Sequence, residues 1–112
     1  LEITILDIGK ADCILIEVDD KVVMIDTGLD KNGRRILDTL DKKDISKIDY
    51  MILTHLDKDH IGGADTILSN IEVEHVIQPN YTRDTKQYEE YSDALQENDI
   101  SPIIHTLRST KI

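Results

Sequence analysis

The chain has 112 residues, which is enough for one small domain, and we predict a single domain over residues 1–112. Its formal net charge of −10 and its scattered lysines and arginines exclude a basic groove of the kind that nonspecific nucleic-acid binding needs. Apolar residues make up 39% of the chain, 18 of them isoleucine, and phenylalanine and tryptophan are absent. This composition favours a core of buried strands flanked by helices.

The first third of the chain predicts three strands and a helix. Residues 2–8 alternate apolar and polar side chains and predict the first strand. Residues 13–18 and 21–26 predict a hairpin, because two acidic residues suited to a tight turn separate them. A helix follows over residues 32–42, with Asp30 as its expected N-cap.

The rest of the chain alternates between strands and helices. Strands are predicted over residues 49–54, 73–77 and 102–108, and helices over residues 62–70 and 85–98. The full order is β-β-β-α-β-α-β-α-β. It predicts an α/β (α+β) fold with a mixed sheet and flanking helices.

Four candidate metal ligands follow the strand predicted over residues 49–54: His55, Asp57, Asp59 and His60. In an extended segment alternate side chains point the same way, so three of the four can face one point, and a bend adds the fourth. Imidazole and carboxylate are the usual ligands of zinc, iron and manganese. The run therefore predicts a metal site at the end of a buried strand.

Two other interpretations compete for this run. A solvated acidic loop with two incidental histidines stays open. A calcium loop fits Asp57, Asp59 and Gly62 at its first, third and sixth positions. It fails at the fifth and twelfth positions, where Ile61 and Leu68 cannot supply a side-chain oxygen.

The run resembles the H-x-H-x-D-H motif of the metallo-β-lactamase superfamily, with Asp57 in place of the second histidine. The longer form T-H-x-D-x-D-H-x-G-G is similar to the branch that contains the hydrolase domain of the bacterial DNA-uptake protein ComEC. Two earlier segments, residues 7–16 and 23–28, resemble that branch in the same order. The resemblance implies half of an αββα sandwich, namely the N-terminal half of a domain longer than this chain.

The resemblance also implies roles for individual residues. His55 and Asp57 would bind a first metal ion, and Asp59 and His60 a second, while Asp59 would also orient the attacking water as the catalytic residue. Asp26 would support the ligands from behind, although a role in capping its own turn is equally compatible. The metal would be zinc, with manganese or iron as alternatives, because Asp57 makes the site harder and more anionic.

The implied function is that of a metal-dependent hydrolase, in which water activated by a metal attacks a phosphodiester or another ester or amide bond. The remaining ligands would come from a second half, because His75 and His105 fall in predicted strands. We therefore expect this fragment to hold metal weakly or not at all and to be inactive alone. The alternative is a catalytically inert, self-associating structural or metal-binding half-domain.

The sequence says less about the binding partners and the cellular compartment. The substrate of the parent protein would be a small-molecule or nucleic-acid phosphodiester, and Tyr81 and Arg83 would contact it or serve as a plain connector. An open sheet edge would allow a homodimer. Cys13 is expected in the core. Because it is a single cysteine, no disulfide can form within one chain, which agrees with a cytoplasmic location without establishing it. No signal peptide or membrane segment is recognised in the sequence.

Overall fold

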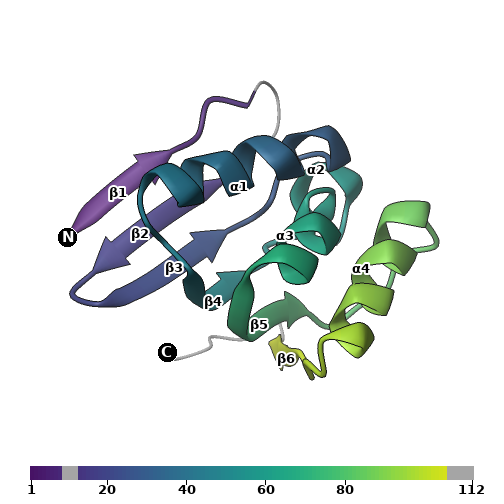
Figure 1. Cartoon of the computed structure of the whole chain (residues 1–112). Coiled ribbons are helices and arrows are strands. Elements are labelled where there is room, and N and C mark those ends of the chain that lie inside the picture. Colours follow the sequence, from purple (N-terminus) through teal and green to yellow (C-terminus); the bar gives the residue numbers. More distant parts are fainter. Residues whose placement is uncertain (9–12, 106–112) are drawn as a thin grey trace.

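The computed structural model describes residues 1–8 and 13–105, and within them one mixed sheet of six strands forms one layer of the molecule (Figure 1). Its strands lie side by side in chain order: β1 (Glu2–Ile5), β2 (Ile14–Val18), β3 (Lys21–Ile25), β4 (Lys47–Ile52), β5 (Glu72–Pro79) and β6 (Ile103–His105). The first three strands are antiparallel, and β3 to β6 are parallel. This arrangement confirms the predicted mixed sheet.

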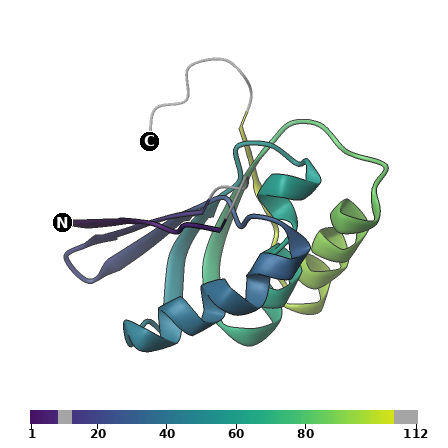
Figure 2. The same cartoon turned by 90° about the horizontal axis from the view of Figure 1, so that it is seen from above.

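The helices connect the parallel strands, as a parallel sheet requires. They are α1 (Gly33–Lys42), α2 (Lys58–Ile61), α3 (Ala64–Asn70) and α4 (Lys86–Glu97), with a short 3-10 helix η1 (Asp30–Asn32) before α1. Figure 2 shows that α1, α3 and α4 lie on the same face of the sheet. The described part of the chain therefore has one sheet layer and one helix layer.

The covered face of the sheet forms the core. One row of paired residues crosses four strands, from Leu15 through Met24 and Met51 to Val76, and each is at most 1% exposed. The helices close this row with buried side chains such as Ile36 on α1. The absence of aromatic side chains other than tyrosine explains why methionine and isoleucine fill this space.

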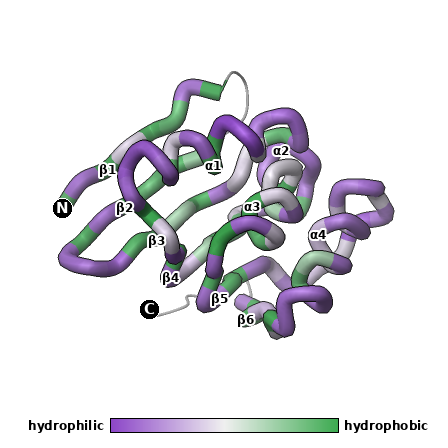
Figure 3. The backbone as a smooth tube through the Cα atoms, in the orientation of Figure 1, coloured by the Kyte–Doolittle hydropathy of each residue, from purple (hydrophilic) through white to green (hydrophobic). Residues whose placement is uncertain are grey.

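The opposite face of the sheet is also apolar, although no described helix covers it. The register aligns one row from Ile3 to His75 and a second row from Ile5 to Ile103. These two rows contain eleven positions, of which ten are apolar and the other is His75; the members are Ile3, Ile16, Val23, Tyr50, His75, Ile5, Ile14, Ile25, Ile52, Ile77 and Ile103. Figure 3 shows hydrophobic segments along β1, β2 and β3. We call these eleven residues the open face.

Three predictions about the elements were wrong in detail. The first strand ends at Ile5 instead of continuing to residue 8. Asp30 is not an N-cap: it lies inside η1, and the Asn32 side chain accepts from the Leu29 amide at 2.8 Å instead. The turn of α2 falls where only a loop was predicted. The predicted end of the last strand, residues 106–108, lies outside the described residues, as do residues 9–12 of the segment 7–16 that resembles the ComEC branch.

Candidate metal centre

Three connections meet at the carboxyl edge of the parallel strands. Asp26 follows β3, residues 54–60 follow β4, and residues 80–85 follow β5. Because these strands run parallel, their carboxyl ends lie at one edge, where α/β sheets commonly bind ligands. We call residues 54–60 the histidine loop, since it carries His55 and His60.

Asp26 is the buried carboxylate that organises this edge. It is 4% exposed and has a φ of 62°, a left-handed conformation that Asp adopts more readily than most residues. One carboxylate oxygen accepts from the Thr54 amide at 2.9 Å, and the other accepts from the Thr54 hydroxyl at 2.6 Å. Asp26 therefore fixes the start of the histidine loop against the end of β3.

The ring of His60 is oriented by the same carboxylate. Its Nδ1 lies 3.1 Å from Oδ2 of Asp26, and its backbone carbonyl accepts from the Thr27 hydroxyl at 2.8 Å. Because a carboxylate can only accept a hydrogen bond, Nδ1 of a neutral His60 carries the ring hydrogen. The free lone pair of the ring is then on Nε2. That Nε2 lies 3.7 Å from Oδ1 of Asp59. His60 thus presents a ligand nitrogen beside a carboxylate oxygen.

His55 is oriented indirectly, through Thr54. The Thr54 hydroxyl donates its only hydrogen to Asp26, so toward Nδ1 of His55, 3.1 Å away, it acts as an acceptor. This leaves the lone pair of His55 on Nε2 as well. The rings of His55 and His60 lie side by side, with centroids 4.7 Å apart. Two imidazoles with available Nε2 atoms next to a carboxylate have the chemistry of a zinc site. In the described residues, however, no three of the loop's candidate ligands offer atoms that all lie within 4.8 Å of one another, so these side chains would have to move closer to share one cation.

Asp57 forms an ion pair with Arg83 of the same chain. Nε of Arg83 donates to Oδ1 of Asp57 at 2.8 Å, and both side chains are about half exposed. This hydrogen bond to Arg83 is the main reason that the pKa of the Asp57 carboxyl lies below its usual value. The loop is tied to the same neighbouring segment by the amide of Leu56, which donates to the Tyr81 hydroxyl at 2.9 Å.

The predicted extended geometry is wrong for the second half of the loop. His55 and Asp57 precede α2, whereas Asp59 and His60 lie within its single turn, where the amide of His60 donates to the Asp57 carbonyl at 2.9 Å. The structure therefore places His55 beside His60, Asp59 next to His60, and Asp57 against Arg83. The ligand roles of these four residues stay a prediction.

Two glycines let the loop pack closely on the segment after β3. A side chain at Gly62 would meet backbone atoms of Leu29 and Asp30, and a side chain at Gly63 would meet the Thr27 carbonyl. The amide of Gly62 donates to the Gly28 carbonyl at 2.9 Å. These two glycines therefore permit the close backbone approach that a residue with a side chain would prevent.

A second group of carboxylates lies away from the histidine loop. Asp30, Asp65 and Glu90 each offer an oxygen within 4.8 Å of the others, from η1, α3 and α4. Burial, and then the charge of Asp30, raise the pKa of the Asp65 carboxyl above its usual value. We call these three residues the acidic cluster. Sequence analysis missed it, because its members come from three elements with no motif among them.

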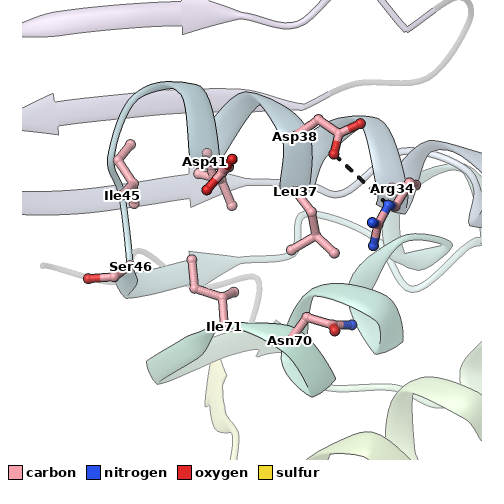
Figure 4. A pocket seen from close by; sticks show the side chains of 9 residues that line it. Arg34, Leu37, Asp38, Asp41, Ile45, Ser46, Asn70 and Ile71 are labelled. Carbon is pink, nitrogen blue, oxygen red and sulfur yellow. Dashed lines mark ion pairs between the residues drawn. The ribbon is translucent and has the colours of Figure 1, made fainter.

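A hollow between α1 and α3 shares no lining residue with either group (Figure 4). It measures about 390 Å³ and is lined by residues such as Arg34, Leu37 and Ile71. Ser46 and Ile71, which also line it, precede β4 and β5. The hollow therefore lies at the amino edge of the parallel strands, opposite the histidine loop.

The other candidate side chains lie where the sequence predicted. His75 is in β5 and stacks beside Tyr50, with ring centroids 5.0 Å apart, and His105 is in β6. Cys13 is fully buried, and burial raises the pKa of its thiol to about 12. A neutral, buried thiol agrees with packing and not with a nucleophile.

No sequence pattern marks the central role of Thr54. A threonine that ends a buried strand carries no signal of its own, since β-branched residues are common there. Its role depends on the parallel register of β3 and β4, which brings Asp26 beside it.

The chain matches known proteins along most of its length. The model of the metallo-beta-lactamase superfamily matches residues 6–109. ComE operon protein 3 of Bacillus subtilis (strain 168) is 28% identical, over 70% of this chain and 12% of that protein. A metallo-beta-lactamase from Pontibacter korlensis has a similar fold, with a TM-score of 0.57 at 12% identity, over 99% of this chain and 55% of that one. A diphosphatase from the PhnP family has a TM-score of 0.53 at 21% identity, over 90% of this chain and 39% of that one.

These matches confirm the predicted fold and the ComEC-like resemblance. The chain spans 12% of the length of the curated relative and 26% to 55% of the solved chains that resemble it. In the residues that the structure describes, none of the helices has the length and apolar character needed to span a membrane.

Proposed function

We propose, from the premise that the chain belongs to the metallo-β-lactamase superfamily, that it supplies the metal-binding loop of a hydrolase acting on a phosphodiester or another ester or amide bond. The superfamily is one of metal-dependent hydrolases, and its fold implies use of a divalent metal, typically zinc. A cation bound here would lower the pKa of water toward neutrality and polarise the bond under attack.

The observation that carries this proposal is the position of Asp26. This one buried carboxylate holds the ring of His60 directly and that of His55 through Thr54, so that both imidazoles keep Nε2 for a ligand. Carboxylates placed behind metal-binding histidines fix the ring tautomer and raise the basicity of the ligand nitrogen. A solvated acidic loop would not need such support.

We assign the residues of the loop as follows. His55, His60 and Asp59 hold the cation, and Asp57 joins them when its carboxylate leaves Arg83. Asp59 also orients water, because its side chain is about half exposed and lies next to His60. Zinc fits the two imidazoles, while the two carboxylates keep manganese and iron as alternatives. A second cation would need ligands beyond the described loop.

The test combines metal binding with turnover. Zinc and manganese would be measured by equilibrium dialysis, and hydrolysis of a simple activated phosphodiester would be measured for the chain and for the protein encoded by its whole reading frame. Asp59→Ala should lower turnover at least 100-fold, whereas Ser92→Ala on α4 should have no effect. Unchanged turnover in Asp59→Ala would remove Asp59 from the mechanism, and absence of metal binding would remove the proposal.

The open face favours a second candidate, in which the chain is an inert half-domain that pairs with a second copy of itself. Ile3 and Ile5 of the edge strand are 58% and 73% exposed, and the eleven positions of the open face include no Asp, Glu, Lys or Arg. Two chains that each carry a charge of −10 can meet at such a face without opposing carboxylates.

Self-association is tested by measuring the molar mass in solution with and without zinc. Ile5→Lys on the open face should turn a dimer into a monomer. Ile104→Lys is the control, since Ile104 is 47% exposed but pairs with Gln78 on the other face of the sheet. A chain that is monomeric at every concentration and turns over substrate would contradict the second candidate.

A further inference from the structure

Among the described residues, Arg83 is the one cationic side chain that forms an ion pair with the histidine loop from another element. It lies in the connection between β5 and α4, which ends at the same edge of the sheet as the loop. Its Nε donates to Oδ1 of Asp57 at 2.8 Å, across 26 positions of sequence. Lys58 belongs to the loop itself, but it is exposed and has no ion pair among the described residues.

Tyr81 holds the guanidinium of Arg83 in place. The carbon Cζ of Arg83 lies 4.3 Å from the centre of the Tyr81 ring, which is a cation–π contact. The hydroxyl of the same ring accepts from the amide of Leu56, inside the histidine loop, at 2.9 Å. The ring is therefore anchored to the loop at one end and supports Arg83 on its face, so the position of the guanidinium is built into the fold.

The guanidinium makes little use of its remaining donors. Apart from Nε, one terminal nitrogen donates to the Thr82 carbonyl at 3.5 Å, a long contact, and the other has no hydrogen bond within the described residues. Arginine carries five donors in a planar fork, a geometry that suits the oxygens of a phosphate group. Arg83 thus retains donors at the edge of the site while its Nε is held by Asp57.

We propose that Arg83 is the anion-recognising residue of this site, which neutralises Asp57 in the absence of a cation and turns to a phosphate group of the substrate once a divalent cation occupies that carboxylate. The proposal rests on the proposed metal-dependent function and narrows its substrate class to phosphate esters. The divalent cation and the guanidinium of Arg83 compete for the Asp57 carboxylate, because it cannot bind both of them fully at the same time. Tyr81 keeps Arg83 at the edge of the site when Asp57 is taken.

The first test measures metal affinity without any turnover. Arg83→Gln removes the internal competitor for Asp57, so zinc and manganese should bind about threefold to tenfold more tightly by calorimetric titration. Arg34→Gln is the matched control, because Arg34 is an exposed arginine on α1 whose ion pair, to Asp38, spans 3.9 Å. It should leave the affinity unchanged. An equal or weaker metal affinity in Arg83→Gln would overturn the proposal.

The second test measures binding of inorganic phosphate to the zinc-loaded chain. Arg83→Gln should weaken it at least tenfold, and Arg83→Lys should recover part of that loss because it restores the charge without the planar fork. Tyr81→Leu should weaken phosphate binding as well, since it removes the ring that supports Arg83. Phosphate affinity that is the same in the parent chain and in Arg83→Gln would overturn the proposal.

The two outcomes separate this inference from the function on which it rests. If the parent chain binds neither zinc nor manganese, the proposed metal-dependent function fails. If it binds metal and Arg83→Gln changes neither the metal affinity nor the phosphate affinity, only the role of Arg83 fails. Circular dichroism of each variant checks that the half-exposed substitutions leave the fold intact.

Discussion

The histidine loop and the acidic cluster both gather carboxylates, but they differ in what lies behind them. The loop rests on Asp26, which is 4% exposed and orients two imidazoles through hydrogen bonds of defined direction. The acidic cluster has three carboxylates on the helix layer and neither an imidazole nor a buried partner in its group. Carboxylates often lie near one another at a protein surface, whereas imidazole rings of fixed tautomer need a hydrogen-bonding partner from the core.

The two regions are joined where α2 packs beside η1. The amide of Gly62 donates to the Gly28 carbonyl at 2.9 Å, and no room exists for a side chain between α2 and the backbone of Leu29 and Asp30. The histidine loop is thus positioned by strand ends on one side and by a glycine contact on the other. Substitutions at this contact and behind each region can separate their roles.

The largest effect is expected at the glycine contact. Gly62→Ala places a methyl group against backbone atoms on both sides, including the Lys58 carbonyl at 2.5 Å, so we expect a loss of about 3 kcal/mol in the free energy of unfolding. Gly33→Ala is the comparison, because the three atoms nearest to its methyl group belong to the Thr66 side chain, at 2.9 to 3.2 Å, and not to backbone at 2.3 to 2.5 Å, so a smaller loss is expected. Urea unfolding measures both. Equal losses would show that backbone contact at Gly62 does not position α2.

The next largest effect is expected on zinc affinity, when Asp26 and a second buried carboxylate, Asp49, are substituted in turn. Asp26→Asn should weaken zinc binding about 10-fold to 100-fold, because the amide cannot accept from both Thr54 and His60 in the same way. Asp49 is equally buried, at 4% exposure, and accepts from the Val22 amide at 2.8 Å away from the loop. Asp49→Asn should therefore lower stability but leave zinc affinity unchanged. A similar loss of affinity in both variants would reduce Asp26 to a general structural role.

Much of the fold could be predicted because strands leave a period of two in the sequence. The alternation that marks β2 and β3 also places Leu15 and Met24 on one face and Ile16 and Val23 on the other. The sequence could not tell which face the helices cover, since both rows are apolar. That choice depends on the handedness of the crossovers between parallel strands.

The candidate site was predictable only in part. Residues 23–28 and the histidine loop both resemble family motifs, so Asp26 and His60 could be named as candidates from the sequence. The expectation that Asp30 is an N-cap was wrong, because the side chain that accepts from a backbone amide in this turn is that of Asn32. The single turn of α2 is too short to show helical periodicity. The support that Thr54 gives His55 depends on the register between strands, which no local pattern records.

The smallest effect is expected in the acidic cluster. Burial raises the pKa of Asp65 above its usual value of 3.8, so the folded chain holds this proton more tightly than the unfolded chain does. The ionised Asp65 carboxylate therefore lowers the free energy of unfolding at pH values above its folded pKa. This loss disappears as the pH falls through that pKa. Asp65→Asn should stabilise the chain by at most about 0.5 kcal/mol at pH 7, and the gain should vanish near pH 4.

The effect of zinc on the melting temperature tests which of the two regions binds a cation. If the histidine loop is the metal site, zinc should raise the melting temperature of Asp65→Asn as much as that of the parent chain, since the cluster takes no part in binding. Asp38→Asn, which removes a carboxylate that is 62% exposed on α1, is the control for a simple loss of negative charge. A zinc-induced shift that is lost in Asp65→Asn but kept in Asp38→Asn would transfer the cation site to the acidic cluster. In that case three carboxylates held only by helix packing would bind metal better than two imidazoles fixed by Asp26.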